Sequence, residues 1–224
     1  MSTPSAAPHC CIIGAGPGIG AAVAEAFAEE GLNLSLIART PERLRELVAE
    51  LVKQTGRTVR TFAGDAGDDP SLLAALRAAV RALGPVDVLV YNVASFETGR
   101  PTTLSTERLL AEFHTNVAGA LTAVREVAGS MRKRKRGTLL FTGGGFAYEP
   151  APNYASLSLG KAALRSLTYT LAQELGVDGI HVATVTVHGF VQPGTKFDPR
   201  NIAASYIALY RQPQGHFEIE KIFK

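Results

Sequence analysis

A glycine-rich turn near the N-terminus carries the first recognisable chemistry in this sequence. Its seven residues read Gly14-Ala-Gly-Pro-Gly-Ile-Gly20. Glycines let a ligand approach the backbone closely, and the start of a following helix offers free N–H groups and the positive end of the helix dipole. A turn of this composition between a strand and a helix is suited to binding a phosphate or diphosphate group.

The segments around the turn have the patterns that such a site requires. The apolar run Cys10–Ile13 is typical of a short buried strand, and helical spacing after the turn predicts a helix that ends at Gly31. Further apolar runs predict strands at 32–38, 59–63, 86–91, 137–142, 180–187 and 217–223. Apolar periodicity predicts helices at 41–51, 69–83, 106–131, 153–175 and 201–210, with Asp69 as the N-cap of the second of these.

The alternation of strands and helices indicates the fold class. It predicts right-handed βαβ units and an α/β fold, namely a doubly wound, Rossmann-like domain with a mostly parallel seven-stranded sheet and helices on both faces. We find no repeat, linker or second domain, so residues 1–224 are expected to form a single domain. Such a sheet binds its ligand at the carboxyl ends of the strands, where the strand order reverses.

The spacing of the glycines distinguishes between two dinucleotide motifs. A GxGxxG motif needs a glycine at the position of Ile19, whereas GxxxGxG fits through Gly14, Gly18 and Gly20. In this pattern the sequence resembles the short-chain dehydrogenase/reductase family, over about residues 9 to 192. The resemblance implies a nicotinamide dinucleotide bound along the segment that contains Gly14, Gly18, Ile19 and Gly20.

The end of the strand at 32–38 indicates which nicotinamide cofactor is preferred. An acidic residue there would bind the ribose 2′-hydroxyl of NAD, whereas an arginine suits the 2′-phosphate of NADP. Arg39 occupies this position and no carboxylate precedes Glu42. We therefore expect NADP(H) rather than NAD(H).

The family resemblance implies further cofactor contacts. Asp65 follows the strand at 59–63, where family members place an aspartate against the adenine. Asn92 lies in a Tyr-Asn-Val-Ala segment that partly matches the Asn-Asn-Ala-Gly of the family. Gly189 and Val191 fall in the segment beside the nicotinamide, and Lys161 would hold the ribose.

The resemblance also implies a catalytic centre, from which this sequence departs. Family members reduce a carbonyl with a tyrosine as proton donor, a lysine one helical turn later, a serine after the fifth strand and an asparagine in the long helix. Lys161 and Asn116 match that lysine and asparagine, but Leu157 occupies the tyrosine position and Gly144 the serine position. The chain therefore keeps two of the four groups.

Other side chains near these positions are candidates for the missing acid. Tyr154 lies two helical turns before Lys161, so both share a helix face if the helix has begun by Tyr154. We expect Tyr154 to act with Lys161 and Asn116 in catalysis. His188 could donate a proton near neutral pH. The remaining candidates are Ser158, Thr142 and Tyr148.

The composition excludes several other classes of protein. The 224 residues are 46% hydrophobic and 19% charged, with a net charge of +3 that implies no strong attraction to nucleic acid or acidic membranes. The basic run at 132–136 is interpreted as a solvated helix end. No secretory signal or membrane span is found, and the adjacent Cys10 and Cys11 suit packed thiols. We expect a cytoplasmic protein without a metal site, and a homodimer or homotetramer.

Three functions remain open at this point. The first is an NADP(H)-dependent oxidoreductase with an altered proton donor that acts on a small, apolar carbonyl, enone or imine. The second is a non-redox enzyme, such as a cyclase or isomerase, that uses the same pocket. The third is a catalytically silent NADP-binding regulator. Retained cofactor contacts favour the first or third function, and the substitutions at Leu157 and Gly144 favour the second or third.

Overall fold

One seven-stranded sheet organises the computed structural model, which describes residues 7–224. The prediction that the chain has no secretory signal rests mainly on residues 1–6, which lie outside this range. The strands are β1 (His9–Ile13), β2 (Asn33–Ala38), β3 (Val59–Ala63), β4 (Val88–Tyr91), β5 (Gly137–Gly144), β6 (Ile180–Val187) and β7 (Glu220–Phe223). Their order is β3-β2-β1-β4-β5-β6-β7, and every neighbouring pair is parallel. The predicted doubly wound α/β fold is confirmed.

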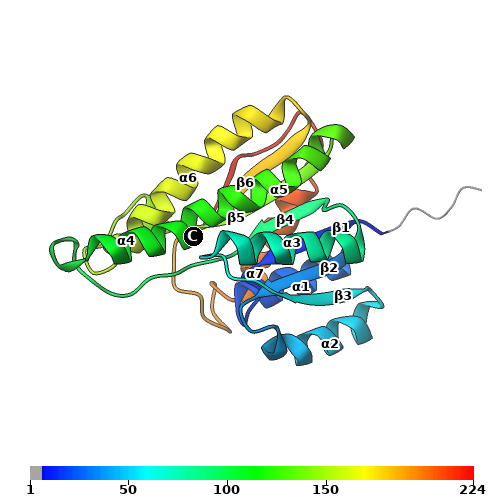
Figure 1. Cartoon of the computed structure of the whole chain (residues 1–224), viewed down its shortest axis with the longest axis horizontal. Helices are drawn as coiled ribbons and strands as arrows, with labels where there is room; N and C mark the ends of the chain where they lie inside the picture. Colours follow the sequence, from blue (N-terminus) through cyan, green and yellow to red (C-terminus); the bar gives the residue numbers. More distant parts are fainter. Residues whose placement is uncertain (1–6) are drawn as a thin grey trace, which may run out of the picture.

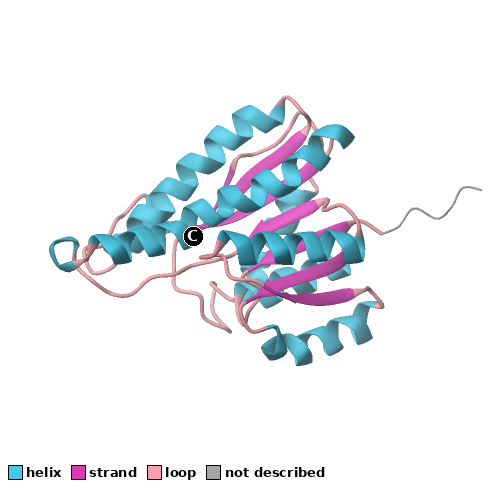
Figure 2. Ribbon diagram, viewed as in Figure 1, coloured by secondary structure: helices cyan, strands magenta, loops and turns pink. Residues whose placement is uncertain are grey.

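Helices cover both faces of the sheet (Figures 1 and 2). They are α1 (Ile19–Glu29), α2 (Arg45–Thr55), α3 (Asp69–Leu83), α4 (Thr106–Phe113), α5 (Gly119–Arg134), α6 (Ala155–Gly176) and α7 (Pro199–Tyr210). One apolar cluster packs α1, α2 and α7 against one face, and a second packs α3, α5 and α6 against the other. Among residues 7–224, no helix is long and apolar enough to cross a membrane.

The sheet order places the strand reversal between β1 and β4. From this point β2 and β3 extend to one side, while β5, β6 and β7 extend to the other. The loops after β1 and β4 therefore diverge to opposite faces and leave a crevice at the carboxyl ends of the strands. Figure 1 shows α4 and the start of α6 on this same side of the sheet.

Several boundaries differ from the sequence-based prediction. The helix predicted at 106–131 is interrupted by a π turn at His114–Ala118, which separates α4 from α5. The helix predicted from residue 153 begins at Ala155, with Tyr154 as its N-cap residue. Asp68, rather than the predicted Asp69, caps α3 by accepting a hydrogen bond from the Ser71 N–H at 3.1 Å. Caps depend on backbone angles that a periodic apolar pattern does not specify.

Gly119 allows α5 to approach the central strands closely. A methyl group at this position would overlap the carbonyl oxygen of Ala66 and lie 2.6 Å from the hydroxyl of Tyr91. We expect Gly119→Ala to lower the free energy of unfolding by about 1–3 kcal/mol, because the neighbouring backbone has to move. The measurement is the denaturation midpoint in urea.

Gly129 in the same helix provides the matched control. Its added methyl group meets nothing within 4 Å, so Gly129→Ala should raise the free energy of unfolding by about 0.5–1 kcal/mol through helix propensity. Equal effects of the two substitutions would contradict the close packing of α5 at Gly119.

Candidate functional site

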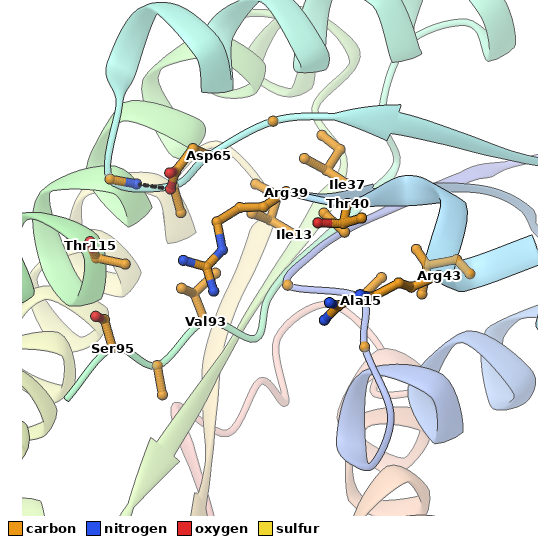
Figure 3. Close-up of a pocket in the computed structure, with 18 of the residues that line it drawn as sticks. Ile13, Ala15, Ile37, Arg39, Thr40, Arg43, Asp65, Val93, Ser95 and Thr115 are labelled. Carbon is orange, nitrogen blue, oxygen red and sulfur yellow. Dashed lines mark hydrogen bonds between the residues drawn. The ribbon is translucent and has the colours of Figure 1, made fainter. Parts of the chain in front are cut away.

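A cavity of about 410 Å³ opens at the carboxyl ends of the first four strands (Figure 3). Its lining comes from the glycine-rich turn, the segment after β2, the turn after β3 and the loop after β4, with Thr115 from the π turn. Three of the predicted binding residues line it, namely Gly14, Arg39 and Asp65. The topology thus brings together segments that are far apart in the sequence.

The glycine-rich turn combines tight packing with an open surface. A methyl group on Gly14 would overlap the carbonyl oxygen of Asn92, and one on Gly20 would lie 2.7 Å from the carbonyl oxygen of Gly14. By contrast, Gly16 and Gly18 have nothing within 4 Å of such a methyl group. Gly18 is also the N-cap residue of α1, with a φ of 92°. Backbone N–H groups at the start of α1 are therefore accessible to an anion.

Two arginines reach the cavity from the segment after β2. Figure 3 shows the side chain of Arg39 extending across the cavity between Asp65 and Val93, while Arg43 extends toward Ala15 of the glycine-rich turn. Both arginines are exposed, and both carry a planar group that pairs well with phosphate. Sequence reasoning identified Arg39 but missed Arg43, which lies one helical turn further along the chain.

Asp65 lies on the opposite wall of the cavity. Its Oδ1 accepts a hydrogen bond from the N–H of Gly67 at 2.9 Å, which Figure 3 draws as a dashed line. The backbone N–H of Asp65 donates to the hydroxyl of Ser71 at 3.1 Å. These two bonds fix the turn between β3 and α3 and hold the carboxylate at the cavity.

The amide of Asn92 is bonded within the protein. Its Nδ2 donates to the carbonyl oxygen of Gly14 at 3.1 Å, and its Oδ1 accepts from the hydroxyl of Thr142 at 2.7 Å. The Thr142 oxygen lies 2.6 Å from the phenol of Tyr206 on α7, which is fully buried. Since the Thr142 proton is already donated to Asn92, the phenol is the donor. This chain of bonds links α7, β5 and β4 to the glycine-rich turn.

Removing the Thr142 hydroxyl tests that chain of bonds. We expect Thr142→Val to lower the free energy of unfolding by about 1–3 kcal/mol, because the buried phenol of Tyr206 and the Asn92 oxygen both lose a partner. The measurement is urea denaturation of the wild type, Thr142→Val, Tyr206→Phe and the double variant. Effects of the two single substitutions that simply add in the double variant would contradict the coupling.

Lys161 occupies a buried position on α6, only 7% exposed. Its Nζ donates to the backbone carbonyl oxygen of Thr142 at 2.7 Å. Burial lowers the pKa of Lys161 to about 8, because the charged ammonium is removed from water. A methyl group on Gly144 would lie 3.5–3.6 Å from the Lys161 side chain, and Leu157 lies one helical turn before it. Lys161 thus lies next to Gly144 and one helical turn after Leu157.

Asn116 in the π turn holds the loop after β4. Its Nδ2 donates to the carbonyl oxygen of Ser95 at 2.7 Å, and its Oδ1 accepts from the Ser95 N–H at 2.8 Å. A methyl group on Gly160 would lie 3.2 Å from Asn116, so the small residue lets α6 pack directly on the π turn. Asn116 therefore joins α6 at Gly160 to the cavity wall at Ser95.

Tyr154 and His188 have different surroundings. Tyr154 precedes α6, and its ring stacks on Phe146 with a centroid distance of 5.2 Å. His188 follows β6, and its ring lies against Gly145 and 5.4 Å from the ring of Tyr148. The Nε2 of His188 is buried without a hydrogen-bond partner among residues 7–224. The helix has not begun at Tyr154, which is the N-cap residue of α6 with a non-helical backbone, so helical spacing does not place Tyr154 on the same face as Lys161.

The remaining predicted contacts lie outside the cavity lining. Gly189 packs against the ring of Phe197, which a methyl group there would overlap, and Val191 is exposed in the same loop. Gly18, Ile19 and Gly20 form the start of α1 next to the cavity.

The basic run at the end of α5 forms ion pairs with neighbouring carboxylates. Arg132 pairs with Glu174 and Asp178, and Lys135 pairs with Asp178 at 2.7 Å. Arg134 pairs with Asp87 of the segment before β4. These pairs agree with the interpretation of the run as a helix end.

Comparisons with known proteins give a consistent result. The short chain dehydrogenase family matches residues 8–198. A 2,3-dihydro-2,3-dihydroxybenzoate dehydrogenase of Bacillus subtilis is 32% identical over 164 residues, which are 73% of this chain and 62% of that protein. A 3-dehydrosphinganine reductase of Arabidopsis thaliana is 28% identical over 227 residues, which are 100% of this chain and 68% of that protein. The chain thus spans less than two thirds of the Bacillus enzyme.

Solved structures extend the likeness to the whole fold. A metagenomic short-chain oxidoreductase in complex with NADP has a TM-score of 0.87 and 27% identity, covering 96% of this chain and 95% of that one. An alcohol dehydrogenase from Thermococcus sibiricus, complexed with 5-hydroxy-NADP, has the same TM-score and coverage at 24% identity.

Proposed function

Because this chain belongs to the short-chain dehydrogenase family, we propose that it is an NADP(H)-dependent oxidoreductase with an altered proton donor. The single observation that carries the proposal is the cavity that joins the glycine-rich turn, Arg39 and Arg43 to the wall held by Asn116. Anion-binding groups line the cavity at the glycine-rich turn and the two arginines, and the buried Lys161 lies outside the lining. Both halves of a nicotinamide dinucleotide thus have candidate contacts.

The residues fit the cofactor on structural grounds. The open backbone at Gly16 and Gly18 and the start of α1 suit its diphosphate, and Arg39 with Arg43 suits a 2′-phosphate. Asp65, which lines the cavity, is proposed for the adenosine half. Lys161, Asn116, Gly189 and Val191 are proposed for the nicotinamide half. When bound, the cofactor supplies or accepts a hydride.

Lys161 is the proposed source of the proton in reduction. A carbonyl that accepts a hydride develops an alkoxide, which needs a proton from the protein. The Lys161 side chain borders the space that Gly144 leaves open through its Cγ, Cδ and Cε atoms. The lowered pKa of its ammonium, about 8, makes Lys161 a better acid than an exposed lysine. Asn116 acts as a positioning residue, since it holds Ser95 and packs against α6.

Tyr154 is the other candidate for the proton donor, and the sequence pattern favoured it. If its phenol were the acid, replacing Tyr154 with phenylalanine would remove the proton donor and leave Lys161 with the ribose alone. Its place at the N-cap and its stacking on Phe146 favour Lys161 instead. The pH dependence of the Lys161 and Tyr154 variants separates the two assignments.

The proposed substrate is a small, apolar carbonyl compound, enone or imine. A site without the tyrosine and serine of the family suits a group that needs little acid assistance, because general acid catalysis contributes about 10²–10⁴-fold. Leu157 and Gly144 give the site no polar side chain at these two positions. These two substitutions also favour the alternative, a non-redox enzyme or a silent NADP-binding regulator.

Self-association is also proposed for this chain. Leu110 on α4 and Leu159 on α6 are 61% and 52% exposed, and Leu121 on α5 is 38% exposed. We propose that these helices pair with a second copy in a homodimer or homotetramer in the cytoplasm. Light scattering after gel filtration tests this, and a monomer at micromolar concentration would contradict it.

Titration with NADPH and NADH, followed by calorimetry, tests the proposed cofactor. We expect NADPH to bind at least about tenfold more tightly than NADH, because only NADPH offers a 2′-phosphate to Arg39 and Arg43. Binding of neither nucleotide would overturn the proposal and favour the non-redox alternative.

A further inference from the structure

Three aromatic rings gather at the carboxyl ends of β4 and β5 without a role in the proposed reaction. Phe96 comes from the loop after β4, Phe146 from the loop after β5, and Tyr154 from the residue before α6. The ring of Tyr154 stacks on Phe146 at 5.2 Å with an interplanar angle of 21°, and meets the edge of Phe96 at 5.9 Å. We call these three residues the aromatic cluster.

Phe96 is both exposed and held in place. Its side chain is 45% exposed. The preceding residue, Ser95, is fixed at its N–H and its carbonyl by Asn116. The following residue, Glu97, donates its N–H to the buried carboxylate of Glu112 at 3.0 Å, and its own carboxylate pairs with Arg108 at 3.0 Å. The backbone on both sides of Phe96 is therefore fixed, so that the exposed ring is presented from a rigid loop.

Backbone bonds join the two loops that carry the rings. The N–H of Gly99 donates to the carbonyl of Asn153 at 2.9 Å, and Gly99 pairs with Tyr154 in an isolated parallel bridge. The start of α6 is therefore tied to the loop after β4. The arrangement of the three rings is therefore set by the fold before any ligand binds, which reduces the entropy cost of binding.

The aromatic cluster adjoins the proposed proton donor. Phe146 lies two residues after Gly144 in the sequence, and Gly144 lies against the side chain of Lys161. Phe96 is next to Ser95, which Asn116 holds beside α6. The cluster thus lies beside the groups proposed to act on the carbonyl, and it contributes rings without charge. The nearby charged side chains form ion pairs, with Arg108 lying 3.0 Å from both Glu97 and Glu112.

We propose that Phe96, Phe146 and Tyr154 form a subsite for the flat, aromatic part of an aryl ketone, aryl enone or aryl imine substrate. The inference rests on the proposed function for the type of reaction, but the aromatic cluster is a separate binding surface that can be tested without turnover. Aromatic rings favour offset-stacked and edge-to-face contacts with another ring, so each ring of the cluster adds selectivity for an aryl over an alkyl group. Tyr154 contributes its ring rather than its hydroxyl.

Binding of 2-acetylnaphthalene tests the subsite, with 2-butanone as the alkyl comparison. Calorimetry in the presence and absence of NADP⁺ measures both ketones on the wild type, Phe96→Ala, Tyr154→Phe and Tyr154→Leu. We expect the aryl ketone to bind about tenfold or more tightly than 2-butanone, Phe96→Ala and Tyr154→Leu each to weaken it by about three- to tenfold, and Tyr154→Phe to retain it.

Phe113→Ala is the matched control. Phe113 is 38% exposed on α4 and stacks on no other ring among residues 7–224. Its replacement should leave aryl ketone binding unchanged, and thermal melting verifies that each variant is folded.

Each remaining outcome separates the subsite from the reaction. Equal binding of the aryl ketone to the wild type and to folded Phe96→Ala, or equal losses in Phe96→Ala and Phe113→Ala, would overturn the subsite. Aryl ketone binding that depends on Phe96 in a protein that binds neither nucleotide would support the subsite and refute the proposed oxidoreductase. Nucleotide binding that depends on Arg39, without aryl selectivity, would refute the subsite alone.

Discussion

Replacing Lys161 with methionine is expected to lower the rate of carbonyl reduction by about 10²–10⁴-fold. The buried ammonium is the proposed proton donor, and methionine keeps much of the side-chain volume without the acidic proton. Thr142 also loses the hydrogen bond that its carbonyl accepts from Nζ at 2.7 Å. The measurement is NADPH oxidation followed by absorbance, at saturating NADPH, with an aryl ketone as substrate.

The rate of carbonyl reduction is expected to depend on pH through the protonation of Lys161. Burial lowers the pKa of Lys161 to about 8, so the ammonium is present below pH 8 and is lost as the pH rises through that value. Reduction by the wild type should therefore fall about tenfold per pH unit above pH 8. Tyr154→Phe should keep this decline, whereas Lys161→Met should show a flat profile. A decline that disappears in Tyr154→Phe and persists in Lys161→Met would assign the acid to Tyr154.

Replacing Arg39 with alanine is expected to raise the Kd for NADPH by about 10- to 100-fold and to leave the Kd for NADH almost unchanged. The reason is the loss of charge-assisted hydrogen bonds to the 2′-phosphate, which are worth about 1.5–3 kcal/mol. Arg39→Ala with Arg43→Ala should abolish the preference for NADPH, since both arginines line the cavity. Calorimetric titration with both nucleotides is the measurement.

Arg45→Ala is the control for the change in net charge. Arg45 begins α2, two residues after Arg43, and does not line the cavity. Its replacement should change the Kd for NADPH by less than about twofold, because an exposed charge outside the cavity is screened by salt. An equal loss in Arg39→Ala and Arg45→Ala would indicate a general electrostatic effect and contradict a 2′-phosphate contact.

The sequence predicted the fold well because its signals are local and periodic. Each strand is a short apolar run, and each helix has an apolar face, so the parallel sheet and its seven strands follow from the alternation. The break between α4 and α5 has no such signal, because the π turn at His114–Ala118 keeps helical periodicity on both sides. The start of α6 was placed two residues early for a related reason, since Tyr154 has a non-helical backbone that its residue type does not reveal.

The site was predictable where one segment carries the signal. The glycine-rich turn, Arg39 and Asp65 each follow a strand directly, and the carboxyl ends of parallel strands meet at one edge of the sheet. Arg43 was missed because its access to the cavity depends on the short 3₁₀ turn at Pro41–Leu44 before α2. The bond between Thr142 and Tyr206, and the aromatic cluster, join segments that only the tertiary fold brings together.

The most direct test of the proposed function is a single-turnover experiment with NADPH. Excess protein is mixed with NADPH and a saturating aryl ketone, aryl enone or cyclic aryl imine, and the absorbance of the reduced nicotinamide is followed. We expect bound NADPH to be oxidised stoichiometrically by at least one of the three compounds, with its hydride recovered in the reduced product. Bound NADPH that stays reduced in the presence of all three bound compounds would contradict the proposed oxidoreductase activity and favour a silent NADP-binding protein.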